Sequence, residues 1–200
     1  MDIRYPCGFY MKILGIVGGI GAGKSTVTDI FEKNFDIHVI NTDKIGHEVL
    51  LKTGKAYDMI IAEFGTAILD DDGEIIREKL ANIVFCDEEK LKNLNSIMHP
   101  CIYEIVVERI KQATNEYVLI EAALLIESGF YKLADIIIGV YADEDLRIQR
   151  IMNRNNYTYE QAKDRINAQL KWKDLRDMVD IVIDNSNDIE FTTTQVIASL

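Results

Sequence analysis

The sequence predicts an α/β fold in which a parallel β-sheet lies between two layers of helices. Short apolar runs recur along the 200 residues and alternate with segments of helical periodicity, which is the order of elements in doubly wound domains. The runs at 12–17 (KILGIV) and 135–141 (DIIIGVY) are apolar at nearly every position. Strands of this kind are typical of parallel sheets that helices cover on both faces. We therefore expect a three-layer α/β domain.

The individual elements follow from the same patterns of apolar residues. Strands are expected at 12–17, 37–40, 117–120, 135–141 and 180–183. Helices are expected at 24–34, 44–52, 55–64, 77–85, 88–112, 143–153, 158–171 and 188–199. The helix over 88–112 should break at His99-Pro100, because a residue before proline is disfavoured in the helical conformation. The stretch from 44 to 112 is longer than an ordinary crossover between parallel strands, which predicts a helical substrate-binding insertion.

Composition limits the partners of the chain. Its net charge is −11, so it is a poor general binder of nucleic acid or of anionic membranes, and a phosphate-bearing ligand must meet a local basic patch. Three widely spaced cysteines argue against a disulfide framework, and no apolar run is long enough to span a membrane. We therefore expect a cytoplasmic protein, monomeric or with a small homo-oligomer as the alternative.

The first ten residues precede a second methionine, Met11, and the first strand pattern begins directly after it, at Lys12. This arrangement predicts that residues 1–10 are a loose extension and that residues 11–200 form the domain. A short ordered arm is the alternative.

A phosphate-binding loop is the strongest motif in the sequence. Residues 18–25 (GGIGAGKS) satisfy GxxxxGK[ST] between a predicted strand and a predicted helix. Glycines let backbone N–H groups approach phosphate oxygens, and the helix N-terminus adds free donors. Lys24 can reach the β- and γ-phosphates, and the Ser25 hydroxyl can bind Mg²⁺. The predicted ATP-binding residues of the loop are Gly19, Ile20, Gly21, Ala22, Gly23, Lys24, Ser25 and Thr26.

Among proteins with this loop, the sequence favours a small-molecule kinase. A GTPase needs a guanine-reading NKxD, which is missing, and the DDDG at 70–73 is typical of an acidic turn. No signature of an ABC-type ATPase occurs, and the chain is short for a motor ATPase. Two alternatives stay open, a kinase for another nucleoside or nucleotide and a regulatory protein that binds ATP without transferring phosphate.

Asp43 follows the second predicted strand, at the edge of the sheet where ligands bind in open α/β folds. A carboxylate there can accept the proton of an attacking hydroxyl and orient it toward the γ-phosphate. The sequence supports equally the alternative that Asp43 is the N-cap of the next helix.

The basic patch that the acidic chain requires lies between residues 147 and 176. This segment holds eight basic and three acidic residues, a balance of +5. Arg147, Arg150 and Arg154 stand at i, i+3 and i+7, on one face of a helix. Such a face can close over ATP as a helical lid that stabilises the moving phosphoryl group and excludes water. The alternative is a solvated basic face.

Taken in order, the motifs resemble the dephospho-CoA kinase family. The resemblance rests on GGIGAGKST (18–26), Asp43, Asp72-Gly73 with Arg77, Leu80 and Phe85, His99-Pro100, Leu124-Leu125-Ile126-Glu127, Arg150 with Arg154, Arg165-Ile166 with Gln169, and Ile183-Asp184-Asn185. The family often has Asp where this chain has Asn41, commonly has proline where it has Ala123, and frequently has lysine where it has Leu175. A carboxylate at position 41 would help to hold Mg²⁺ through a bound water, and Asn41 lacks that carboxylate. Glu121, at the end of the third predicted strand, is another candidate for contact with such a water.

The resemblance implies a P-loop NTPase-type fold and the ATP-dependent phosphorylation of the ribose 3′-hydroxyl of dephospho-CoA, which completes coenzyme A synthesis. Residues 44–112 would bind CoA and residues 146–178 would form the lid. The implied catalytic residues are Asp43, Lys24 and Arg150. Arg150 and Arg154 are also implied to bind ATP. The implied substrate-binding residues are Asp43, Arg77, His99, Leu125, Glu127 and Arg165. For His99 a structural role is the alternative, and for Trp172, the single tryptophan, packing is favoured over stacking on adenine.

Overall fold

The computed structural model describes residues 11–122 and 125–200, and the predicted extension at 1–10 lies outside them. The chain divides into two compact units. One unit is made of the chain up to Ile40 and from Ala113 onward, and the other is Asn41–Gln112. None of the helices in the described residues is both long and apolar enough to cross a membrane.

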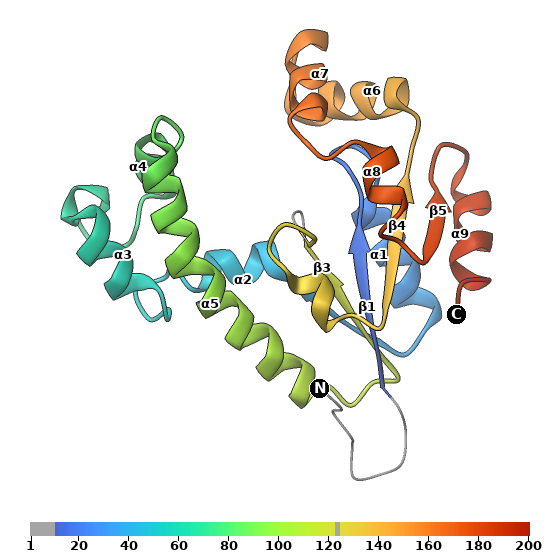
Figure 1. The fold of residues 1–200 in the computed structure, drawn as a ribbon, viewed down its shortest axis with the longest axis horizontal. Coiled ribbons are helices and arrows are strands. Elements are labelled where there is room, and N and C mark those ends of the chain that lie inside the picture. Colours follow the sequence, from blue (N-terminus) through green and yellow to red (C-terminus); the bar gives the residue numbers. More distant parts are fainter. Residues whose placement is uncertain (1–10, 123–124) are drawn as a thin grey trace. The chain divides into compact units, whose positions relative to one another are not determined.

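The first unit is built on a parallel five-stranded sheet with the order β2-β3-β1-β4-β5 (Figure 1). The strands are β1 (Lys12–Val17), β2 (Ile37–Asn41), β3 (Tyr117–Glu121), β4 (Ile136–Tyr141) and β5 (Ile181–Asp184). The central strand β1 pairs with both β3 and β4, and Leu14 lies opposite Leu119 on one side and Ile136 on the other. All five expected strands are present, within one residue at each end. The continuous apolar sequence of β1 is explained, because the strand is covered on both faces.

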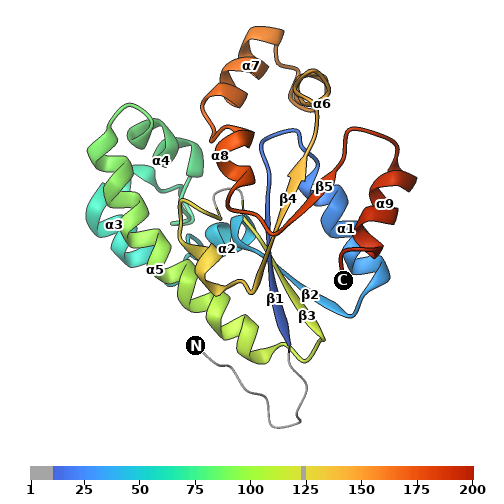
Figure 2. The same ribbon diagram turned by 45° about the vertical axis from the view of Figure 1, so that its right-hand side comes forward.

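One face of the sheet is covered by α1 (Lys24–Asn34) and α9 (Ile189–Ile197), which lie side by side (Figure 2). Leu14 and Ile16 of β1 belong to a fully buried cluster with Phe31 of α1 and Val196 of α9. Burial of such side chains contributes about 1.5–3 kcal/mol each. This cluster fixes the sheet beneath the segment that joins β1 to α1.

The residues that alternate with Leu14 and Ile16 along β1 point to the other face of the sheet. There Gly15 packs under Leu125, which follows β3, and Gly139 of β4 packs under Trp172. The Trp172 ring also contacts Tyr141 at the end of β4, with 5.1 Å between ring centroids. Trp172 therefore packs against the sheet, as its position in the sequence led us to expect.

Three helices of this unit lie between β4 and β5 in the sequence. They are α6 (Glu144–Asn155), α7 (Tyr159–Asn167) and α8 (Trp172–Arg176). Ile148 and Ile151 of α6 pack against Ala162 and Ile166 of α7 in a small apolar cluster. A capping box at Thr158 and Gln161 starts α7. The helix expected over 158–171 ends at Asn167, and α8 was not expected.

The second unit, Asn41–Gln112, is helical. It consists of α2 (Thr42–Glu48), α3 (Tyr57–Phe64), a 3₁₀ turn at Thr66–Ile68 (η1), α4 (Arg77–Val84) and α5 (Glu88–Gln112). The helix α5 packs against α2, α3 and α4 through buried side chains that include Ile102, Val106 and Ile110. The expected turn at 70–73 is present, with Gly73 at φ +79°.

The expected break at His99-Pro100 is wrong, because α5 runs continuously through Pro100. Proline removes one N–H donor from the helical ladder, at a cost of about 3 kcal/mol. Pro100 is exposed, so water can bond to the carbonyl that this leaves without its helical donor. Buried residues in the next turns, Cys101, Ile102 and Val106, hold the helix together beyond that point.

Alanine substitutions at two glycines should change the free energy of unfolding in opposite directions. A Cβ on Gly139 would lie 3.0 Å from Val179 and 3.1 Å from Trp172, whereas one on Gly46 in α2 would meet only Ile102, at 3.7 Å. Gly139→Ala should therefore lower the free energy of unfolding by about 1–3 kcal/mol through overpacking. Gly46→Ala should raise it by about 0.5–1 kcal/mol, because alanine favours a helix. Denaturant unfolding followed by circular dichroism measures both, and shifts of the same sign would contradict this account.

Candidate functional site

The loop between β1 and α1 has the backbone of a phosphate cradle. Gly21 and Gly23 adopt φ values of +77° and +93°, in the left-handed region that favours glycine. A turn inside the loop is closed by a hydrogen bond of 3.0 Å from the Ala22 N–H to the Gly19 carbonyl. The glycine spacing in the sequence therefore corresponds to two backbone positions that other residues rarely adopt.

Lys24 begins α1 directly after this loop. Its Nζ donates to the Gly18 carbonyl over 2.7 Å, so the side chain folds back along the loop. Ser25 follows and is exposed, and Thr26 lies beside it in the same turn. The ammonium and the hydroxyl thus lie at the N-terminus of a helix, where the backbone favours anions.

Two arginines of α6 hold the outer side of the loop. The Arg147 Nε donates to the Ile20 carbonyl over 2.9 Å. The Arg150 Nη1 donates to the carbonyls of Gly21 and Ala22 over 3.3 and 3.4 Å, and its Nη2 donates to the Asn185 carbonyl over 3.0 Å. In a trans peptide the C=O and the following N–H point in opposite directions. An anchored carbonyl therefore directs the next N–H away from the arginines.

Arg147 is held close to the loop. A Cβ on Gly19 would lie 2.3 Å from its Nη2, so a larger residue at 19 would displace the guanidinium from this position. Burial lowers the pKa of Arg147, while the charges of Glu144 and Tyr141 raise it. The guanidinium thus gives up part of its hydration to contact the loop backbone.

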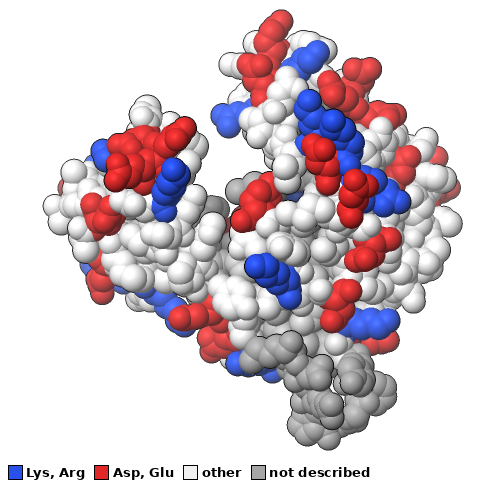
Figure 3. Space-filling model, in the orientation of Figure 1, with Lys and Arg blue, Asp and Glu red and all other residues white. Residues whose placement is uncertain are grey.

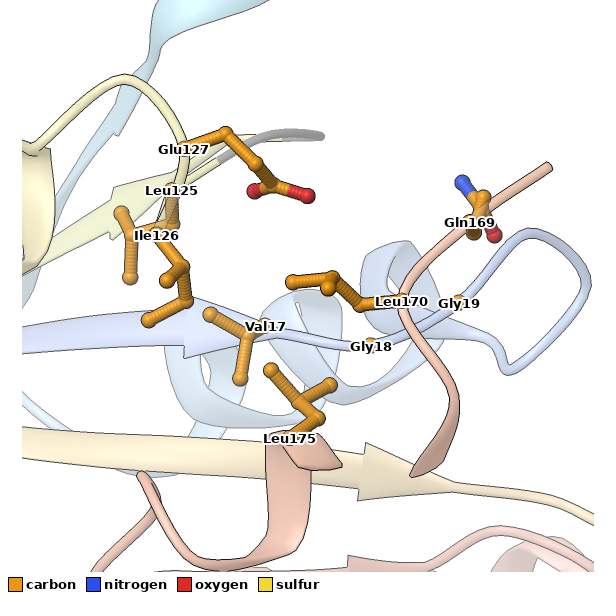
Figure 4. A pocket seen from close by; sticks show the side chains of 9 residues that line it. All are labelled: Val17, Gly18, Gly19, Leu125, Ile126, Glu127, Gln169, Leu170 and Leu175. Atoms are coloured by element: carbon orange, nitrogen blue, oxygen red, sulfur yellow. The ribbon is translucent and has the colours of Figure 1, made fainter. Parts of the chain in front are cut away.

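A hollow beside the loop is lined by residues from three segments of this unit. Gln169, after α7, accepts a hydrogen bond of 2.7 Å from the Ile20 N–H. In Figure 4, Glu127 and Gln169 lie on opposite sides of the hollow and Leu170 lies between them. Leu125 is almost fully buried in the wall and Glu127 is exposed at the rim. A second hollow continues from Glu127 toward Lys171 and Lys173.

Comparisons with known proteins agree with this geometry. The family model described as dephospho-CoA kinase matches residues 12–190. The chain belongs to the dephospho-CoA kinase family.

Two curated members of the dephospho-CoA kinase family cover nearly the whole chain. The dephospho-CoA kinase of Oceanobacillus iheyensis is 42% identical over 188 residues, which are 92% of this chain and 94% of that protein. The enzyme of Carboxydothermus hydrogenoformans is 37% identical over 193 residues, covering 95% and 93%.

Solved structures agree. The dephospho-CoA kinase of Campylobacter jejuni superposes with a TM-score of 0.71 at 26% identity, covering 94% of this chain and 95% of that one. A Thermus thermophilus protein superposes with a TM-score of 0.81 at 27% identity, covering 96% and 98%. A shikimate kinase from Bacteroides thetaiotaomicron, at 12% identity and a TM-score of 0.57 over 94% and 96%, shares the fold.

The predicted site residues of the first unit fall into two groups. The loop residues and Arg150 come together, and Leu125 and Glu127 lie in the hollow beside them. Arg154 is exposed at the end of α6 and donates to Asn155, and Arg165 is exposed on α7. The structure thus brings one of the two predicted lid arginines to the loop.

Asp43, Arg77 and His99 belong to the unit Asn41–Gln112 and are exposed on α2, α4 and α5. Asp43 lies in the first turn of α2, but it does not cap this helix. The cap is Asn41, whose Oδ1 accepts a hydrogen bond of 2.9 Å from the Lys44 N–H. The capping alternative for Asp43 is therefore wrong, and its role as a base stays a prediction.

Three residues that contact the loop were not assigned to the site from the sequence. Arg147 was noted only as one of several basic residues, although its spacing from Arg150 placed both on one face. Gln169 and Asn185 were noted only as parts of family motifs. Gln169 and Asn185 contact loop residues that are 149 and 163 positions away in the sequence. No local sequence pattern predicts such contacts.

The loop contact of Arg147 can be tested by removing its guanidinium. Arg147→Met keeps most of the apolar stem but frees the Ile20 carbonyl, so the loop loses one anchor. We expect the Kd for MgATP to rise about tenfold, the value of one hydrogen bond to a charged donor. Lys12→Met is the matched control, since it removes the same charge at the exposed start of β1. Isothermal titration calorimetry measures both, and equal Kd values for the two variants would remove Arg147 from the site.

Proposed function

We propose that this protein is an ATP-dependent dephospho-CoA kinase. It transfers the γ-phosphoryl group of ATP to the ribose 3′-hydroxyl of dephospho-CoA, giving CoA and ADP, as the final step of coenzyme A synthesis in the cytoplasm. The observation that carries the proposal is the anchored phosphate loop in a chain that matches this family over residues 12–190. Acidic and basic side chains are interspersed on the face shown in Figure 3, which supports small phosphate ligands rather than nucleic acid as partners.

In this proposal the N–H groups of Gly21 and Gly23, each of which follows an anchored carbonyl, bind the phosphates of ATP together with Lys24. Phosphoryl transfer depends mainly on positioning and on charge stabilisation. Arg150 and Arg154 act on the charge that develops on the moving phosphoryl group. Asp43 accepts the proton of the 3′-hydroxyl as the oxygen attacks the γ-phosphorus, and ADP leaves.

The proposed acceptor-binding residues are those that the family resemblance implies. Arg77 and His99 contribute from the unit Asn41–Gln112. Leu125, Glu127 and Arg165 contribute from the first unit, where Leu125 and Glu127 line the hollow beside the loop. The apolar lining of Leu125, Ile126 and Leu170 suits the uncharged part of the acceptor.

Mg²⁺ is the metal that this reaction implies. It usually keeps several waters and takes one or two protein ligands together with phosphate oxygens. The exposed Ser25 hydroxyl, one residue beyond Lys24, suits that mode of binding. Bound there, Mg²⁺ would neutralise phosphate charge. Among the residues that the structure describes, no group of three His, Cys, Asp or Glu side chains could hold a metal.

The decisive experiment is an ADP-release assay with ATP, Mg²⁺ and one acceptor at a time. We expect release with dephospho-CoA, with CoA confirmed by mass, and background release with AMP, CMP or no acceptor. Lys24→Ala should lose most of this activity. Release with a nucleoside monophosphate instead would favour another nucleotide kinase. ATP binding without release for any acceptor would favour a regulatory protein.

Asp43→Asn tests the proposed base. Loss of a general base typically lowers the rate 10²–10⁴-fold, so kcat should fall at least about a hundredfold while the KM for ATP stays within about twofold. Asp58→Asn is the matched control, because Asp58 is also exposed in the first turn of a helix of the same unit. Steady-state kinetics of both variants decides the matter, and an unchanged kcat in Asp43→Asn would exclude Asp43 as the base.

A further inference from the structure

A buried polar pair lies behind the phosphate loop. Asn185, directly after β5, and Thr192 of α9 are buried, with 4% and 0% of their surface exposed. The Thr192 Oγ1 is 3.1 Å from the Asn185 Oδ1, and the Asn185 Nδ2 donates to the Ala22 carbonyl over 2.8 Å. Buried polar side chains are costly unless they are bonded. These two therefore hold each other and the loop in one arrangement.

The Asn185 amide acts on one particular peptide of the loop. The carbonyl of Ala22 shares its peptide plane with the N–H of Gly23, and the described residues contain no cis peptide bonds. Holding this carbonyl toward Asn185 therefore points the Gly23 N–H in the opposite direction. In a loop of the GxxxxGK[ST] type, such N–H groups must point toward the phosphates.

The fit around this peptide is tight. A Cβ on Gly23 would lie 2.1 Å from the Asn185 Nδ2, so the amide occupies the space that any other residue at 23 would need. The main-chain carbonyl of Asn185 also accepts from Arg150. Asn185 thus contacts both the loop and the arginine that anchors it.

Thr192 has a role that its neighbours on α9 do not share. The hydroxyls of Thr192, Thr193 and Thr194 each lie near the carbonyl four residues earlier, at 3.2, 2.7 and 2.9 Å. Only Thr192 is fully buried and also reaches Asn185. The Ala22 carbonyl can only accept, so it takes the amide Nδ2 and leaves the Asn185 Oδ1 facing Thr192. The Thr192 hydroxyl supplies the donor that this buried oxygen needs.

We infer that Asn185 and Thr192 are positioning residues for the phosphate chain of the nucleotide. Thr192 donates to the Asn185 Oδ1 and so steadies the amide, whose Nδ2 holds the Ala22 carbonyl outward so that the Gly23 N–H faces the phosphates. This inference deepens the proposed function and rests on it only in taking ATP as the nucleotide. Neither side chain needs to touch the substrate.

The test compares variants that differ by one hydroxyl. Thr192→Val keeps the shape but leaves the buried Asn185 Oδ1 without its donor, so the amide is held less firmly on the Ala22 carbonyl. The Kd for MgATP should then rise about tenfold, the value of one hydrogen bond. The Kd for Mg-tripolyphosphate, a probe without a nucleoside, should rise by the same factor. Thr192→Ser keeps the hydroxyl and should stay within about twofold of the wild type. Thr194→Val loses only an exposed helix bond and should behave like the wild type.

A double-mutant cycle shows whether Thr192 acts through Asn185. Asn185→Leu removes the amide, so adding Thr192→Val to it should weaken binding no further. The double variant leaves no unpaired polar atom between positions 185 and 192, and the Ala22 carbonyl keeps its bond from Arg150. It therefore keeps the test open if Thr192→Val alone is unstable. Melting temperatures are measured for every variant, and binding is measured well below them.

Several outcomes would overturn the inference. Among them are an unchanged Kd in Thr192→Val, an equal loss in Thr192→Ser, weaker binding of ATP without weaker binding of tripolyphosphate, and independent effects in the cycle. Calorimetric binding needs no turnover, so failure of the proposed function is seen separately. It would appear as wild-type protein that binds ATP but forms no CoA.

Discussion

The carbonyl groups on the outer side of the phosphate loop are the constraint on which the rest of this site depends. A loop that points its N–H groups toward an anion must point the preceding carbonyls outward. Those carbonyls then need donors, because an unpaired buried carbonyl costs about 1–3 kcal/mol. Arg147, Arg150 and the Asn185 amide supply them. The structure therefore holds the cradle open through contacts made behind it, by segments that follow β4 and β5.

These contacts also limit what the predicted lid can do. The segment 146–178 is held to the rest of the first unit near both of its ends. Arg147 and Arg150 hold its start, and Trp172 and the buried Leu175 hold its end. Between them, α7 packs on α6 through Ala162 and Ile166. A closing movement that kept both attachments would have to centre on α7 and the linkers beside it. The arginines would stay on the loop backbone while the rest of the lid moved.

Sequence patterns sufficed where function and fold depend on local geometry. Glycine spacing predicted the loop because Gly21 and Gly23 need positive φ, and apolar runs predicted the strands because the sheet is covered on both faces. The same reasoning was wrong at Pro100, where buried residues in the following turns outweigh one lost hydrogen bond. It could not find the bond between Asn185 and Ala22, since these residues are 163 positions apart. Nor could it decide the cap of α2, because Asn41 and Asp43 both suit a helix start and only the backbone selects Asn41.

The three arginines of α6 show how far a helical repeat can be taken. Spacings of i, i+3 and i+7 place Arg147, Arg150 and Arg154 on one face, yet they also place them at different heights. At a rise of 1.5 Å per residue, Arg154 lies about 6 Å beyond Arg150 along the axis. Arg147 and Arg150 reach the carbonyls of Ile20, Gly21 and Ala22, while Arg154 donates to the Asn155 side chain. The first two are therefore occupied with the loop itself, and Arg154 is the arginine of this face whose charge is not already used on backbone carbonyls. In the proposed reaction Arg150 would therefore have to exchange its carbonyl bonds for the moving phosphoryl group, whereas Arg154 would not.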